Sequence, residues 1–179
     1  MTVGRWAWLV VVSLGVVVVQ LTLLDELSVH GVHPELVWVL PVAAGLVGGA
    51  MPGMAAGFVG GVVADLFLPT PFGLTAVVAI PIGYAIGRLG EEGIGDLSGA
   101  QWWVAPGLGA LAGLVAPAAY AAVGVVLGHR SYVSPSLVVV CLLDAALCAL
   151  AVRPMMRLLA PLLAQDPLRG RLEPVRGAM

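Results

Sequence analysis

Two carboxylates have the clearest potential for chemistry in this sequence, because each lies inside a long apolar stretch. They are Asp65 and Asp144. A charge at the centre of a bilayer costs at least about 2.5–3.5 kcal/mol, so such a carboxylate is protonated, hydrated or paired within the protein. No basic residue lies at a matching depth in the apolar stretches. Each carboxylate is therefore a candidate for a proton or substrate site, or for a hydrogen-bonded structural role.

The surroundings of the two carboxylates favour structural roles. Asp65 precedes the break Pro69-Thr70-Pro71-Phe72, so its oxygens are expected to accept backbone N–H groups at the start of the next helix. Asp144 shares a helix stripe with Cys141 and Cys148, which indicates an inward face of small residues. The two thiols lie about 10 Å apart along such a helix, too far to form a disulfide. Asp144 is interpreted as a hydrogen-bonded packing residue, with a proton or substrate site as the alternative.

A second polar group follows the first apolar stretch and contains two histidines, His30 and His33, with Asp25, Glu26 and Glu35. The spacing has no cysteine partner and no helix to orient the ligands, so a solvated loop is expected rather than a metal site. No nucleophile–base pair or phosphate-binding loop is visible either. The sequence predicts a non-enzymatic protein with no catalytic, cofactor or metal site.

Composition indicates whether the segments that carry these residues lie in water or in a membrane. The chain has 179 residues, of which 60% are hydrophobic and 10% charged, with a mean hydropathy of +1.05. Soluble domains carry about 25% charged residues. A soluble enzyme, a nucleic-acid binder and a disordered chain are all poor interpretations. An all-α integral membrane protein is expected.

Apolar stretches and their breaks predict six transmembrane helices in one domain, residues 1–153, followed by a short cytoplasmic tail, 154–179. The tract from Leu36 to Leu68 is too long for one span, and Met51-Pro52-Gly53 is the strongest turn signal within it. The stretch from Arg153 to Ala164 is typical of a helix that continues into the interface and is attracted to anionic lipid. The expected spans are residues 6–24, 35–51, 53–68, 72–88, 102–128 and 136–152.

The arginines predict the orientation, because cytoplasmic loops are enriched in positive charge. With six spans both termini lie on one side, and that side holds seven of the eight arginines. We therefore expect both termini in the cytoplasm, with only Arg130 on the other side. The seven are Arg5, Arg88, Arg153, Arg157, Arg169, Arg171 and Arg176.

Glycines at every fourth position indicate close helix packing, because a glycine stripe lets another backbone approach. They run through the second and third expected spans, with the turn at Pro52 interrupting the stripe and Asp65 next in register. The stripe is interpreted as a packing face inside the bundle or as a face that binds a partner. Its members are Gly45, Gly49, Gly53, Gly57 and Gly61.

The segment from Gly53 to Ala76 resembles the family of the rod shape-determining protein MreD. The family pattern is G-x-x-x-G-F-x-x-G-x-x-x-D-L, then a proline-bearing turn and a Gly-Leu-Ser/Thr-Ala helix start. The family's Gly-Tyr-x-x-Gly ending follows at Gly83, Tyr84 and Gly87. The matching residues are Gly53, Gly57, Phe58, Gly61, Asp65, Leu66, Pro71, Gly73, Leu74, Thr75 and Ala76.

The resemblance implies a multi-pass protein of the bacterial inner membrane that organises sidewall peptidoglycan synthesis and rod shape. Its implied partners are the bitopic protein MreC, a SEDS glycosyltransferase, a penicillin-binding transpeptidase and MreB filaments. The implied partner or packing residues are those of the motif, above all Gly53, Gly57, Phe58, Gly61, Asp65, Pro71 and Gly73.

Two alternatives stay open. The family is similar in its six-helix layout to the substrate-binding subunits of energy-coupling-factor transporters, so the chain is alternatively a vitamin-binding subunit. Such a pocket normally needs clustered aromatic and polar side chains, and Thr70, Ser131, Tyr132 and Ser134 supply few of them. A proton-coupled or small-solute transporter would depend on Asp65 and Asp144 alone.

Overall fold

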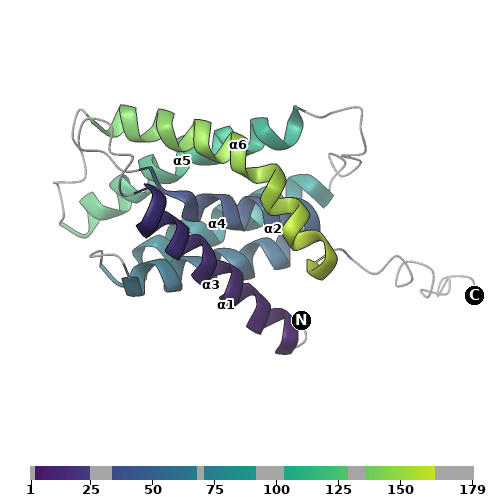
Figure 1. Ribbon diagram of the computed structural model, residues 1–179. Helices are drawn as coiled ribbons and strands as arrows, with labels where there is room; N and C mark the ends of the chain where they lie inside the picture. The colour runs from purple at the N-terminus through teal and green to yellow at the C-terminus, as the bar shows by residue number, and fades with distance from the viewer. Residues whose placement is uncertain (1–2, 25–33, 68–70, 92–102, 129–135, 164–179) are drawn as a thin grey trace, which may run out of the picture.

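The computed structural model describes residues 3–24, 34–67, 71–91, 103–128 and 136–163, and within these ranges it is helical with no strand. Six α-helices make up a bundle (Figure 1). A π-helical turn, η1, extends the first helix over Gln20–Leu24, and a 3-10 turn, η2, precedes the second over Leu36–Trp38. The α-helices are α1 (Val3–Val19), α2 (Val39–Gly48), α3 (Ala50–Phe67), α4 (Leu74–Leu89), α5 (Val104–Val126) and α6 (Leu137–Leu163).

The short helix α2 lies at the centre of the bundle. It packs against α3, α4, α5 and α6, and residues 39–45 are all buried. The hairpin partners α3 and α4 pack together along their lengths, as do α5 and α6, while α1 lies on the outside against α3. The start of α1 and the end of α6 lie at the same end of the bundle (Figure 1). A helix that is apolar on all sides is stable in this central position because other helices cover every face.

Three of the described helices are long and apolar enough to cross a membrane: α3, α5 and α6. Three shorter apolar helices accompany them, over Trp6–Thr22, Leu36–Gly48 and Leu74–Leu89. The thirteen-residue stretch Leu36–Gly48 rises only about 20 Å, less than the roughly 30 Å of a bilayer's hydrocarbon core.

The turn between the second and third helices differs from the sequence prediction. The chain breaks at Gly49, not at Pro52-Gly53, because Gly49 has a φ of +87° that favours glycine. Pro52 instead lies in the first turn of α3, where its missing N–H costs no intrahelical hydrogen bond. The first bond of that helix runs from Gly53 N–H to Gly49 O at 3.0 Å. The predicted interruption of the glycine stripe is therefore moved from Pro52 to Gly49.

The last helix is longer than the predicted span. It continues past residue 152, through Pro154 and Pro161, to Leu163, so the predicted end of the span at residue 152 is not the end of the helix. Leu159 and Leu163 are buried in the core of the bundle, which explains why the helix continues. The expected continuation of the helix beyond Arg153 is confirmed. α5 likewise continues through Pro117.

Candidate functional site

Asp65 caps the start of α4 from the end of α3. Its Oδ2 accepts a hydrogen bond from the Gly73 N–H at 2.9 Å, and its Oδ1 accepts one from the Thr75 N–H at 3.3 Å. Gly73 has a φ of +91°, a conformation that favours glycine. The cap predicted from the sequence is confirmed, and it explains why a glycine and an aspartate eight residues apart occur together in the motif.

Asp144 caps the start of the central helix from the middle of the bundle. It is fully buried, and its Oδ1 accepts a hydrogen bond from the Glu35 N–H at 2.7 Å. The next N–H, of Leu36, donates to Oε1 of Gln20 on η1 at 3.1 Å. Oδ2 of Asp144 is buried without a hydrogen-bond partner among the described residues. The prediction of a hydrogen-bonded packing role for Asp144 is confirmed in part, because one of its two oxygens has a partner.

Glu91 caps α3 in the same way. The N–H of Ala50, the first residue of α3, donates to Oε1 of Glu91 at 2.9 Å. The other carboxylate oxygen lies 3.5 Å from Nη1 of Arg88 on the last turn of α4. This carboxylate therefore joins the start of α3 to the end of α4.

The three caps solve one physical problem. The first N–H groups of a helix have no partner within the helix, and an unpaired buried N–H costs about 1–3 kcal/mol. Here the acceptors come from other elements, so each cap also fixes one helix against another. Side-chain groups with the potential for chemistry thus serve to hold helix ends. Sequence reasoning identified Asp65 and Asp144 but missed Gln20 and Glu91, whose only signal was an acceptor next to an apolar stretch.

Glycines form the contact between α3 and α4. A Cβ at Gly57 would lie 2.5 Å from the Ala79 carbonyl oxygen, and a Cβ at Gly53 or Gly61 would collide with the backbone of Gly83 or Ala76. The two backbones are therefore in direct contact along the whole hairpin. These three glycines are used inside the bundle and are not open to a partner.

The pair α5 and α6 repeats this arrangement around Asp144. A Cβ at Gly109 would lie 2.9 Å from the Cys148 carbonyl oxygen, and one at Gly113 would collide with the backbone of Asp144. Cys148 is buried and Cys141 partly buried, and both are free thiols. The expected inward face of small residues at Cys148 and Asp144 is confirmed.

The remaining motif residues lie away from the α3–α4 contact. Phe58 is 50% exposed and faces a groove between α1 and α3, while Pro71 and Gly73 are half-buried at the α3–α4 turn. Large exposed side chains flank that turn at Leu66, Phe67 and Phe72. Asp65 is thus brought together with Gly73, whereas Phe58 lies apart from them.

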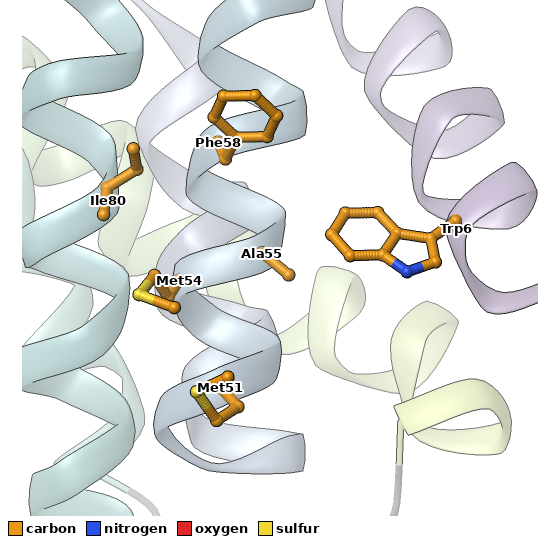
Figure 2. Close-up of a pocket in the computed structure, with 6 residues that line it drawn as sticks. All are labelled: Trp6, Met51, Met54, Ala55, Phe58 and Ile80. Atoms are coloured by element: carbon orange, nitrogen blue, oxygen red, sulfur yellow. The ribbon is translucent and has the colours of Figure 1, made fainter. Parts of the chain in front are cut away.

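The groove that Phe58 faces is apolar and has a volume of about 600 Å³. Trp6 of α1 faces the side chains of α3 across the groove, and Ile80 of α4 completes the lining (Figure 2). Its lining residues are Trp6, Met51, Met54, Ala55, Phe58 and Ile80. We call this cavity the α1–α3 groove.

The loop with His30 and His33 lies outside the described residues, as do Asp25 and Glu26. Within the described part of the chain, no three His, Cys, Asp or Glu side chains gather closely enough to hold a metal ion.

Comparisons with protein-family models, curated proteins and solved structures find no match for this chain. The geometry of its own residues therefore carries the functional argument.

Proposed function

We propose that this chain is a non-enzymatic membrane scaffold of the MreD type, which binds MreC and organises sidewall peptidoglycan synthesis in the bacterial inner membrane. In this proposal the helices form a multi-pass bundle with both termini in the cytoplasm. MreC, the SEDS glycosyltransferase, the transpeptidase and MreB filaments would be its partners.

The observation that carries the proposal is that the glycines and the aspartate of the motif join α3 to α4. Gly53, Gly57 and Gly61 bring α3 against α4, and Asp65 then caps α4 beyond a glycine that has a positive φ. The pattern that resembles the family thus encodes a closely packed pair of helices, which suits a protein that works by contact. A catalytic role would give these residues a different task.

The α3–α4 turn is the proposed contact for MreC. Leu66, Phe67 and Phe72 are 65%, 54% and 68% exposed, and Asp65, next to Leu66, caps the start of α4. Aromatic side chains, phenylalanine included, are enriched at the cores of protein interfaces. In the orientation deduced from the arginines, this turn lies at the outer surface of the membrane.

The experiment is co-purification of MreC with the tagged chain from membranes that express both. Phe72→Ser should lower MreC recovery, whereas Leu150→Ser, at a side chain 79% exposed on α6, should not. Equal recovery with both variants would exclude the α3–α4 turn as the contact, and no recovery with the unaltered chain would exclude the scaffold. Tight retention of a vitamin by the purified chain would instead identify a transporter subunit.

In the same proposal, α2 is a short helix whose start lies inside the bundle. The stretch Leu36–Gly48 begins where Asp144 caps it inside the bundle and is too short for the hydrocarbon core. The buried start of a helix needs acceptors because no water reaches it in a bilayer. Asp144 and Gln20 supply them, so this intramembrane aspartate has a structural purpose.

A further inference from the structure

The α1–α3 groove is an apolar channel that follows α3 from its first turn. Met51, Ala55 and Phe58 are spaced by four and three residues, so they share one face of the helix and extend over about 10 Å along it. Met51 and Phe58 are 63% and 50% exposed, so the groove is open along this side. Figure 2 shows the Trp6 ring forming the opposite wall.

The lining chemistry fits a flexible hydrocarbon chain better than a helix. Helix–helix contacts in membranes use small residues that let backbones approach, and the small residues of α3 at Gly53, Gly57 and Gly61 already face α4. The groove face instead carries thioether and aromatic side chains. Methionine adapts its shape to irregular apolar partners, as an acyl chain requires.

Positive charge gathers at the end of the bundle where this groove begins. The N–H of Ala50, next to Met51, donates to Oε1 of Glu91, and Oε2 of Glu91 lies 3.5 Å from Nη1 of Arg88. The extension of α6 beyond residue 152 carries Arg153 and Arg157. In Figure 1 this extension lies beside the start of α1, and in Figure 2 its yellow-green ribbon passes below Trp6.

Charge of the opposite sign lies at the other end of the described bundle. Asp65 lies there at the end of α3, and Asp144 and Glu35 lie together inside the bundle, whereas Glu91 is the one described carboxylate at the arginine-bearing end. An anionic group at the mouth of the groove would therefore lie at the end of the bundle where, among the described residues, arginines outnumber carboxylates. Arginines close to the membrane surface attract anionic headgroups.

We propose that the α1–α3 groove binds one acyl chain of an anionic phospholipid, with its headgroup at the arginine-bearing end near Trp6 and Met51. The inference depends on the membrane location in the proposed function but not on MreC. Because α1 packs against the rest of the bundle mainly through α3, the bound chain fills the space between them and couples α1 to α3.

The test is native mass spectrometry of the chain purified alone in detergent, with titration of phosphatidylglycerol and phosphatidylcholine of identical acyl chains. We expect one tightly retained phosphatidylglycerol and weaker retention of phosphatidylcholine. Ala55→Phe fills the groove and should weaken phosphatidylglycerol binding about tenfold, the equivalent of removing about two methylenes from contact. The matched control is Ala146→Phe on the exposed side of α6, which should bind as the unaltered chain does.

A second pair of variants covers the possibility that Ala55→Phe does not fold. Met51 is exposed at the headgroup end, so Met51→Glu should weaken phosphatidylglycerol binding more than Met51→Gln, and phosphatidylcholine binding should respond equally to both. Equal affinity for the two lipids, or equal binding by the two Met51 variants, would overturn the proposal. Loss of MreC co-purification with lipid binding retained would refute the proposed function and leave this inference standing.

Discussion

Replacement of Gly57 by alanine is the sharpest test of the α3–α4 contact, because it adds a single methyl group. That Cβ would lie 2.5 Å from the Ala79 carbonyl oxygen, 2.7 Å from its carbon and 3.0 Å from the Ile80 nitrogen. Ordinary contact begins at 3.4 Å, so the shortfall to the oxygen is 3.4 − 2.5 = 0.9 Å. All three neighbours are backbone atoms, so no side chain can rotate away.

The two helices must therefore separate or tilt, which loosens packing along the whole hairpin. Overpacking of this kind costs about 1–3 kcal/mol. The matched control is Gly107→Ala in α5, where an added Cβ meets nothing within 4 Å. That substitution should leave stability unchanged or raise it by up to about 1 kcal/mol, because alanine is the better helix former.

The chain carries its own probe for the assay. Cys148 is buried, so its thiol reacts with a fluorogenic maleimide only when the bundle opens. Removing the partly buried Cys141 by Cys141→Ala leaves one reporter. On heating in detergent, Gly57→Ala should show a lower unfolding midpoint, by roughly 2–4 °C per kcal/mol. Equal midpoints for Gly57→Ala and Gly107→Ala would refute the backbone contact.

Three further predictions concern the caps and the orientation. Asp65→Ala should lower the free energy of unfolding by about 0.5–2 kcal/mol, and Asp65→Asn, which keeps a carbonyl acceptor, should lose less in the same thiol assay; equal losses would contradict the cap. Asp144→Ala leaves the buried Glu35 N–H without its acceptor and should cost about 1–3 kcal/mol, with partial recovery in Asp144→Asn. If Asn restores nothing, the carboxylate charge rather than the hydrogen bond is what matters. A reporter fused after Met179 should be active in the cytoplasm, and activity outside would exclude the proposed orientation.

Composition and apolar runs were sufficient to predict the helical architecture. The starts and ends of most helices fell within a few residues of expectation, because proline, glycine and charge interrupt the apolar stretches there. The exceptions have local causes. The Pro52-Gly53 pair is a strong turn signal, but a proline in the first turn of a helix loses no hydrogen bond, and the positive φ required at the break is found at Gly49.

The predicted sixth span ends at residue 152, whereas α6 continues to Leu163. Pro154 and Arg153 mark a helix end by sequence rules, yet the buried Leu159 and Leu163 give the continuation a packing surface. Packing against residues that are distant in sequence cannot be deduced from the local sequence around Pro154. The cap on α3 was missed for the same reason, because Glu91 and Ala50 are separated by 41 residues.

The caps also show why a buried carboxylate is weak evidence for transport or catalysis in an apolar chain. A helix that starts inside a bundle presents N–H groups with nothing to bind, and a carboxylate from a neighbouring helix is the acceptor that best matches the positive end of the helix dipole. Asp65, Glu91 and Asp144 each meet that need at a different helix. A bundle that binds no ligand would need the same side chains. The position of an intramembrane acid relative to a helix start must therefore be examined before that acid is assigned a role in proton transfer. In Asp144, Oδ1 meets this criterion for a structural role, and the buried Oδ2 without a described partner is the atom at which any further role would be found.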